Sequence, residues 1–333
     1  MAGVQRISLG YNNVYVVDDG GGRVLIDTGP DYRGAREHLQ AELAGKPPGI
    51  VVATHGHLDH AGLGHWWRSS GTPVAIGEGD RHFIAGPQLQ REAEWQGYVS
   101  FVEQSGAPED VAVEVLHGLE ERRAWSRRAS TSADYPPATR ERRWPTGLRY
   151  HPFSASVTFS QDGALAESSS LEVVMCPGHT PGNLVVVHRR EGWLFSGDQL
   201  LPDLTPTPGI QAKGGEHGGD DWRFRSLPAF VRSLRRLRDL DIGRCFPGHG
   251  EPFDDVAAAV AANLDQINQR TERVLQSLRD DGPGSLFAVC ERLYPRAVRR
   301  RFWQIAATVQ GHLDLLVEAG EVVVEGATFR ALR

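Results

Sequence analysis

The chain has 333 residues, with 36 lysine and arginine against 42 aspartate and glutamate side chains. The resulting net charge of −6 argues against a protein built mainly to bind nucleic acid. No apolar run approaches the length of about 18 residues that a membrane span needs, so we expect no contact with a membrane. The start of the chain lacks the apolar core of a signal peptide, and the three cysteines form no CxxC pair. We therefore expect a cytoplasmic protein without a disulfide framework.

Strands and helices alternate in the first part of the chain. Two β-rich runs, 13–17 and 23–27, are separated by Asp-Asp-Gly-Gly-Gly, which predicts a hairpin. Apolar spacing predicts helices over 32–44 and 61–69, and the apolar runs 50–53 and 73–76 predict strands. This alternation indicates a layered α/β fold.

From about residue 80 to residue 150 the pattern changes. Apolar positions become sparse and helical, and charges of both signs are dense. We expect a mostly helical insertion that lies over the core as a cap. Its aromatic residues, among them Trp95 and Tyr98, either line a substrate pocket or only anchor the insertion.

The remaining sequence returns to strands and then becomes helical. Strands are predicted at 153–159, 171–175, 184–188, 193–198 and 244–250, with an amphipathic helix at 228–240. Helices at 255–279, 285–293 and 298–319 are followed by a hairpin at 321–330. We therefore expect a catalytic domain over 1–255 and a small winged-helix-like domain over 256–333.

A dense group of metal-ligand side chains follows the strand 50–53. The run Thr-His-Gly-His-Leu-Asp-His-Ala-Gly contains His55, His57, Asp59 and His60, all good ligands for zinc. Alternate side chains of an extended segment point the same way, so His55 and His57 can bind one ion together. Asp59 and His60 lie where the chain turns, and they can reach a second ion.

Three further ligand-type residues follow strands later in the chain: His179, Asp198 and His249. Seven ligands are too many for one tetrahedral ion and suit two ions that share a bridge. Among the other histidines, His65 is expected to point away from the metals. His151 and His217 could enter the pocket, and His217 is a candidate substrate contact.

The sequence resembles the metallo-β-lactamase superfamily. The resemblance is carried by THGHLDHAG at 54–62, PGHTPGN at 177–183, FSGD at 195–198 and PGHG at 247–250, and by the opening runs 13–15 and 25–29. It implies an α/β fold, the four-layer αββα sandwich, with metals at one edge of the sheets.

The resemblance also implies a role for each ligand. His55, His57 and His179 would hold one divalent ion, and Asp59, His60 and His249 the other, while Asp198 bridges both. Asp27 would orient the histidine run by hydrogen bonding. Zinc is the expected metal, with iron or manganese as alternatives. True β-lactamases of the superfamily typically have cysteine at the bridging position, so Asp198 and His60 favour the glyoxalase II, lactonase and nuclease branches.

These features predict a dinuclear metal-dependent hydrolase. A hydroxide that bridges the metals would attack the substrate, with Asp59 and Asp198 as catalytic carboxylates. We favour a small or medium acyl substrate, namely a thioester, lactone or ester. One alternative is a phosphodiesterase or ribonuclease acting on single-stranded nucleic acid, which the basic run Arg296, Arg299, Arg300 and Arg301 favours. A di-iron, oxygen-dependent enzyme is another.

A protein that uses its winged helix to bind nucleic acid without catalysis is a further alternative. The complete ligand set and the acidic charge argue against it. Winged-helix modules also form dimers, so a homodimer is a further expectation.

Overall fold

Two β-sheets form the centre of the protein, whose computed structural model describes residues 3–18, 21–86, 92–129, 147–149, 151–166, 168, 170–202, 209–213 and 222–332. Within these residues the first sheet has the strand order β1 to β6. Neighbouring strands are antiparallel from β1 to β3 and parallel from β3 to β6. The strands are β1 (Gly3–Leu9), β2 (Asn12–Asp18), β3 (Arg23–Ile26), β4 (Ile50–Val52), β5 (Val74–Gly77) and β6 (Val157–Phe159).

The second sheet has the order β14-β13-β10-β9-β8-β7. Within it only β10 and β13 run parallel among the described strands, and the other pairs are antiparallel. Its strands are β7 (Gly163–Ala164), β8 (Leu171–Met175), β9 (Leu184–His188), β10 (Trp193–Gly197), β13 (Arg244–Pro247) and β14 (Phe253–Asp254).

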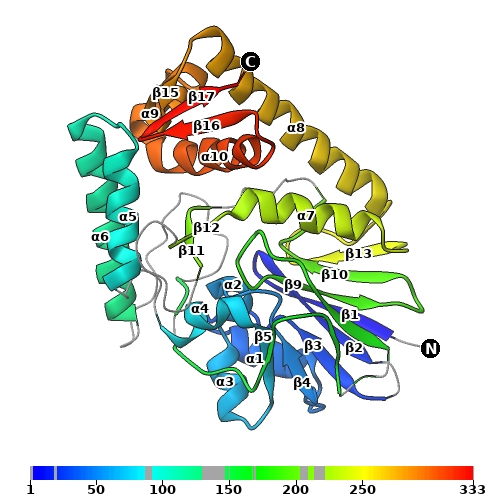
Figure 1. Ribbon diagram of the computed structural model, residues 1–333. Helices are drawn as coiled ribbons and strands as arrows, with labels where there is room; N and C mark the ends of the chain where they lie inside the picture. The colour runs from blue at the N-terminus through cyan, green and yellow to red at the C-terminus, as the bar shows by residue number, and fades with distance from the viewer. Residues whose placement is uncertain are drawn as a thin grey trace.

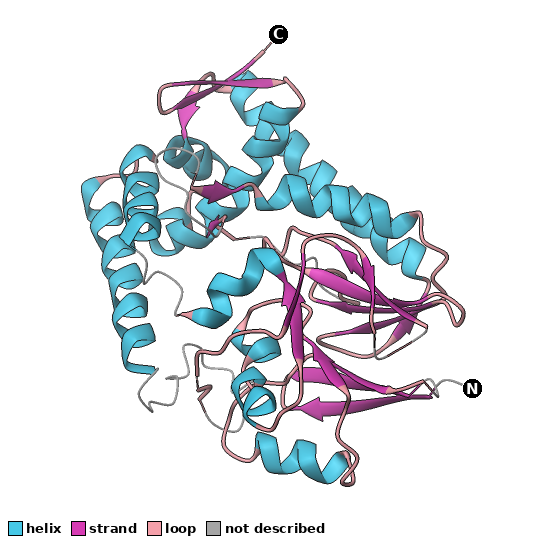
Figure 2. Cartoon of the chain, turned by 60° about the horizontal axis from the view of Figure 1, so that its bottom comes forward, coloured by secondary structure: helices cyan, strands magenta, loops and turns pink. Residues whose placement is uncertain are grey.

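Helices cover the outer face of each sheet (Figures 1 and 2). The strands alternate apolar side chains toward both faces, so each sheet must be covered on both sides. Val24, Ile26 and Val52 of the first sheet pack against Val186 and Phe195 of the second. On the outer faces, α1 (Ala35–Glu42) and α3 (Gly64–Ser69) cover the first sheet, and α7 (Ser226–Arg238) and α8 (Val256–Asp280) cover the second. The predicted αββα sandwich is confirmed.

The parallel strands determine where the functional loops gather. The carboxyl ends of β3, β4 and β5 lie at one edge of the first sheet. The chain leaves these ends at Asp27, at the histidine run with the short helix α2 (Leu58–Ala61), and at η1 (Glu78–Asp80). In the second sheet, β10 and β13 end at Asp198 and at the loop of His249, and the backbone N–H of Gly248 donates to the carbonyl of Gly197 at 2.9 Å. Ligand loops from both sheets therefore meet.

The described helices of the 80–150 region have a partner that the sequence did not predict. After α4 (Arg81–Ala85) come α5 (Glu92–Gln104) and α6 (Glu109–Ala129), which pack against α10 (Val298–Glu318) near the C-terminus. The ring of Trp303 on α10 lies 5.9 Å from that of Tyr98 and 6.0 Å from that of Phe101. Arg299, part of the basic run, pairs with Asp110 of α6 at 2.8 Å. Arg299 therefore links α10 to the insertion at the surface.

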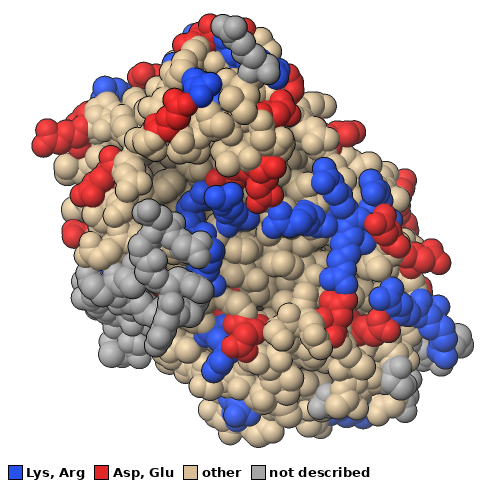
Figure 3. Space-filling view, viewed as in Figure 1, with Lys and Arg blue, Asp and Glu red and all other residues tan. Residues whose placement is uncertain are grey.

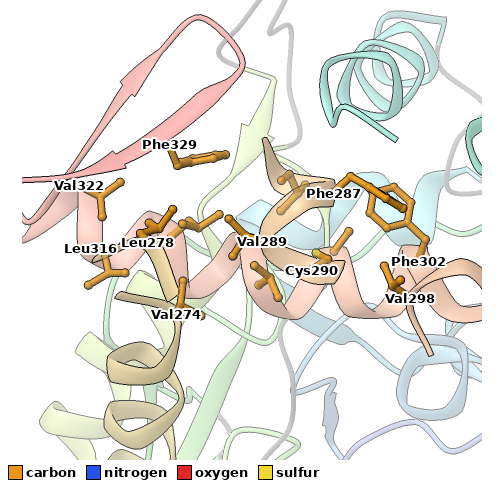
Figure 4. Packing of buried hydrophobic residues seen from close by; sticks show 14 of the residues in the cluster. Val274, Leu278, Phe287, Val289, Cys290, Val298, Phe302, Leu316, Val322 and Phe329 are labelled. Carbon is orange, nitrogen blue, oxygen red and sulfur yellow. The ribbon is translucent and has the colours of Figure 1, made fainter. Parts of the chain in front are cut away.

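The C-terminal segment has the helices and the hairpin that the sequence predicted. Helices α8, α9 (Leu286–Leu293) and α10 enclose an apolar cluster beneath a three-stranded sheet of β15 (Gly284–Ser285), β17 (Thr328–Ala331) and β16 (Val322–Glu325). Figure 4 shows Leu278, Val289 and Phe329 within this cluster. Its interpretation as a winged-helix-like, separate domain stays a prediction. Among the described helices, none has the length and apolar character needed to cross a bilayer.

A small hairpin joins the C-terminal segment to the sandwich. It consists of β11 (Gln211–Ala212) and β12 (Arg223–Phe224). The guanidinium of Arg223 donates two hydrogen bonds, of 2.6 and 2.7 Å, to the buried carboxylate of Asp314 on α10. On the other strand, the amide of Gln211 donates to the backbone carbonyl of His179 at 2.6 Å. The hairpin therefore contacts α10 on one side and a predicted metal ligand on the other.

Candidate metal centre

The first predicted ligand group is compact. His57 Nδ1 lies 3.0 Å from His55 Nε2 and 3.1 Å from His179 Nε2. Two donors that each bind one zinc ion at about 2.0–2.2 Å lie roughly 3–3.5 Å apart in a tetrahedral site. The three imidazoles therefore have the spacing of a single ion's ligands.

The second predicted group lies beside the first. His60 Nε2 and His249 Nε2 are 3.3 Å apart, and His249 Nε2 lies 3.5 Å from Asp59 Oδ2. These three residues again form one group of potential ligand atoms. His60 and His249 are buried, whereas the side chain of Asp59 is 22% exposed. This group therefore has one member that faces solvent.

Asp198 stands between the two groups. Its Oδ1 is 3.3 Å from Nε2 of both His60 and His249, and its Oδ2 is 3.5 Å from His179 Nε2. A carboxylate with one oxygen toward each group has the geometry of a bridging ligand. The structure thus brings all seven residues together in the predicted arrangement, while their role as ligands stays a prediction.

Asp27 orients two of the histidines. Its Oδ2 accepts a hydrogen bond from His60 Nδ1 at 2.7 Å, and its Oδ1 accepts from the backbone N–H and the hydroxyl of Thr54 at 2.7 and 2.8 Å. A carboxylate only accepts, so His60 carries a proton on Nδ1 and turns Nε2 into the site. The Thr54 oxygen in turn accepts a hydrogen bond from His55 Nδ1 at 3.1 Å, so His55 also turns its Nε2 into the site. Asp27 holds a left-handed φ of 65°, a strained conformation that these bonds stabilise.

The turn between β1 and β2 contributes residues that the sequence analysis missed. The carbonyl of Tyr11 accepts from His249 Nδ1 at 3.0 Å, and the Tyr11 ring stacks on the imidazole with 4.2 Å between centroids. The amide of Asn12 donates to Asp59 Oδ2 at 3.3 Å. A backbone carbonyl leaves no sequence signal, whereas Asn12 could have been suspected from its position at the start of a strand beside the site.

Asp80 is the most consequential residue that the sequence analysis missed. It is fully buried, and its carboxylate joins two ligand loops. One oxygen accepts from the Gly56 N–H at 2.8 Å and from the Thr180 hydroxyl at 2.6 Å, and the other accepts from the Gly182 N–H at 2.6 Å. Asp80 follows β5, which runs parallel to β4, so the rule that gathers strand ends at one edge could have identified it.

Glycine permits the closest approach between the loops. A Cβ added at Gly248 would lie 2.6 Å from His60 Cε1 and 3.0 Å from Asp198 Oδ1. Contacts this short do not occur for real side chains, and the neighbours here are ligand side chains held by hydrogen bonds. The loop of His249 can therefore reach Asp198 only because residue 248 lacks a side chain.

Burial and charge divide the histidines into two kinds in the metal-free protein. Burial lowers the pKa of His55 and His57 and lowers that of His179 to about 3. Burial opposes the charge of His249 as well, but the nearby carboxylates of Asp198 and Asp59 raise its pKa to about 9. The carboxylates around His60 likewise outweigh burial and raise its pKa. The charged imidazoles are thus those beside the carboxylates.

The chemistry of this site fits a pair of cations. Nitrogen lone pairs of neutral imidazoles converge at about 3 Å in the first group, where a bound cation would remove their mutual repulsion. Asp198 Oδ1 is buried and, within the described part of the chain, makes no hydrogen bond of acceptable geometry. A buried carboxylate oxygen of this kind is costly unless a charge compensates it.

The metal-free protein should be most stable near pH 6.5. Below that value His55, His57 and His179 are protonated in the unfolded chain but stay neutral in the folded chain, where they are buried. Stability therefore falls as the pH drops. Above it, the folded chain keeps protons on His60 and His249 that the unfolded chain loses, so stability falls as the pH rises toward about 9.

Melting temperatures measured with a chelator at three pH values around this maximum test the prediction. Burial raises the pKa of Asp80 to about 6, which acts in the opposite sense on the acid side, but as one group against several histidines whose pKa is lowered. The alkaline loss should disappear in metal-loaded protein, since cations then replace the protons. A melting temperature of the metal-free protein that stays constant between pH 6.5 and pH 9 would contradict the assignment.

The predicted substrate contacts lie outside the ligand cluster or outside the described residues. Trp95 and Tyr98 are buried with Trp222 in the cluster between α5 and the β11–β12 hairpin, and the Tyr98 hydroxyl donates to the carbonyl of Ile210 at 3.4 Å. This placement supports their anchoring role, and contact with a substrate stays a prediction. His217 falls outside the described residues.

Comparisons with known proteins agree with this geometry. The family model described as "Metallo-beta-lactamase superfamily" matches residues 7–249. A probable metallo-hydrolase of Bacillus subtilis is 31% identical over 93% of this chain and 88% of its own length. An atrochrysone carboxyl ACP thioesterase of Aspergillus fumigatus is 24% identical over 83% of this chain and 62% of its own length.

A solved structure extends the likeness to nearly the whole chain. A metallo-beta-lactamase family protein of Thermus thermophilus superposes with a TM-score of 0.70 at 25% identity, covering 99% of this chain and 98% of that one. The match therefore includes the insertion and the C-terminal segment as well as the sandwich. This chain is a metal-dependent hydrolase and belongs to the metallo-β-lactamase superfamily.

Proposed function

We propose that this protein hydrolyses acyl thioesters with a pair of divalent metal ions. The observation that carries the proposal is the position of Asp198, with one oxygen toward each of two histidine groups. Seven donors in three overlapping groups fit two ions better than one. Zinc suits the mixture of imidazole and carboxylate donors, and iron and manganese are the alternatives.

The ions would supply acidity to a water molecule and polarise the carbonyl oxygen of the substrate. The protein's own contribution is to hold the donors rigidly through Asp27, Tyr11 and Asp80. Asp59 is proposed to pass the proton of the attacking water onward, because it is the carboxylate of its group that reaches solvent.

The cysteines do not offer a second route through an acyl-enzyme. Cys176 and Cys245 are fully buried, and burial raises the pKa of both thiols to about 12. A thiol that stays protonated and lacks access to solvent is a poor nucleophile. This supports direct attack by water on the substrate.

Two observations support a thioester over the other acyl substrates. The first is the relative named as an acyl carrier protein (ACP) thioesterase, although its identity is low. The second is a band of Lys and Arg across the middle of one face, over the region of α7, whose arginines include Arg232, Arg235 and Arg238 (Figure 3). A basic band attracts phosphate-bearing carriers of acyl groups, and it attracts nucleic acid by the same electrostatics.

The test is a hydrolysis screen of metal-loaded protein on acyl thioesters, lactones, phosphodiesters and single-stranded RNA. We expect thioester turnover to exceed phosphodiester and RNA turnover at least tenfold, and chelation to abolish it. Elemental analysis should find at least two ions per chain. Faster hydrolysis of RNA or phosphodiesters would overturn the substrate, and fewer than one ion per chain would overturn the dinuclear centre.

A further inference from the structure

A second group of ligand-type side chains lies apart from the seven. Asp31 follows β3, His65 is on α3, and His151 follows the 80–150 insertion. Nε2 of His65 lies 3.7 Å and Nε2 of His151 lies 3.8 Å from the same oxygen of Asp31. The three ligand atoms all lie within 4.8 Å of one another, and the two imidazole rings are 4.4 Å apart.

Hydrogen bonding fixes the direction in which His65 offers its lone pair. Its Nδ1 donates to the carbonyl of Gly62 at 3.1 Å, so the unprotonated nitrogen is the Nε2 that faces Asp31. Metal-binding histidines usually have this arrangement, with one nitrogen held by a backbone carbonyl and the other toward the ion. Burial also lowers the pKa of His65, which favours the neutral ring.

The three residues are held by ordered backbone. The carbonyl of Asp31 accepts a hydrogen bond from the N–H of Arg149 at 2.7 Å, which fixes the segment just before His151 against the loop after β3. Leu148 is buried in the same apolar cluster as Trp67 of α3. The side chain of Asp31 is only 5% exposed and that of His151 is 39% exposed, so the group is anchored inside and open on one side.

We propose that Asp31, His65 and His151 form a binding site for a single divalent transition-metal ion, separate from the hydrolytic centre. Two imidazole nitrogens and one carboxylate are a donor set that zinc and its neighbours accept. Two ligands that bind one zinc ion at about 2.0–2.2 Å lie roughly 3–3.5 Å apart in a tetrahedral site. The distances of 3.7 and 3.8 Å to Asp31 are slightly longer, so the two imidazoles would move a few tenths of an ångström toward the carboxylate when an ion binds. The open side leaves room for water to complete the coordination.

The position of the site defines what the ion would do. Its ligands come from the loop after β3, from α3 and from the chain that returns from the insertion. A bound ion would tie the end of the insertion to the first sheet, as a disulfide or a structural zinc does in other proteins. The ion would stabilise the fold, and none of the seven residues of the hydrolytic centre takes part.

Metal titration of the metal-depleted full-length chain tests the site. The variant Asp198→Ala weakens the hydrolytic centre, so we use it as background and titrate Co²⁺, whose visible absorption reports coordination. We expect His151→Ala and His65→Ala, each added to this background, to lower the bound Co²⁺ by one equivalent. The exposed His38→Ala should leave the bound Co²⁺ unchanged.

The wild-type background gives an independent count. Wild-type protein should bind one equivalent more than His151→Ala, and its melting temperature should rise with metal by more than that of the variant. Equal stoichiometry in wild type, His151→Ala and His65→Ala would overturn the site and leave the three residues as an ion-paired, stacked cluster. That outcome would leave the proposed hydrolytic centre unaffected, because its ions are counted in wild type and in both variants.

Discussion

Replacing Asp198 with alanine should lower kcat/KM by at least about 10³-fold, or about 4 kcal/mol of activation free energy. Asp198 is the carboxylate whose two oxygens face the two histidine groups. Its loss removes the negative charge that the two groups share. His60 and His249 would also lose the charge partner that lies 3.3 Å from each. Steady-state hydrolysis and elemental analysis on the same preparation measure the effect, and the metal content should fall together with the rate.

The matched control is Asp241→Ala, which removes an exposed carboxylate from the turn before β13. It should leave rate and metal content within about twofold of wild type, because exposed surface charges contribute little. An Asp198→Ala protein that keeps wild-type activity with full metal content would contradict the bridging role. Circular dichroism on both variants separates loss of function from loss of fold.

Asp80→Asn should weaken metal binding by about 10- to 100-fold although Asp80 is not among the predicted ligands. The carboxylate accepts from Gly56, Thr180 and Gly182, and an asparagine would present its NH₂ group to at least one of these donors. A buried donor left without a partner costs about 1–3 kcal/mol, so the free energy of unfolding should fall by about that amount. Competition with a chelator and urea unfolding measure the two effects.

Glu78→Gln on the same short helix is the control, since Glu78 is exposed and pairs with Arg81 at the surface. We expect no change in metal affinity and less than about 1 kcal/mol in stability. If Asp80→Asn lowers stability but leaves metal affinity unchanged, the residue supports the fold alone and does not position the ligand loops.

The sequence predicted that these seven side chains gather in one place because they follow strands or lie within short local motifs. His55, His57, Asp59 and His60 lie within six consecutive positions. Each remaining ligand follows an apolar run that could be recognised as a strand. Asp27 was named through the resemblance to the metallo-β-lactamase superfamily, and it also ends a predicted strand. Its hydrogen bonds to Thr54 and His60 follow from the parallel pairing of β3 and β4.

The residues that escaped prediction act over long sequence separations or through the backbone. Asp80 lies 102 residues from Gly182, and its single carboxylate has no motif around it. Tyr11 binds His249 through a carbonyl that any residue has. The packing of α5 and α6 against α10 depends on which apolar faces meet in space, and amphipathic spacing predicts a buried face without naming its partner. Asp31, His65 and His151 are likewise far apart in the sequence and share no motif, so the sequence did not predict that they lie together.

The β11–β12 hairpin has a consequence for how this protein could have changed in evolution. Arg223 of the hairpin donates hydrogen bonds to Asp314 near the C-terminus, and Gln211 donates one to the backbone carbonyl of His179. A lineage that exchanged the C-terminal segment for an unrelated module would leave the Arg223 guanidinium without its carboxylate and loosen a loop of the metal centre. We therefore expect the two parts to be inherited together, with substitutions at Arg223 and Asp314 occurring as a pair.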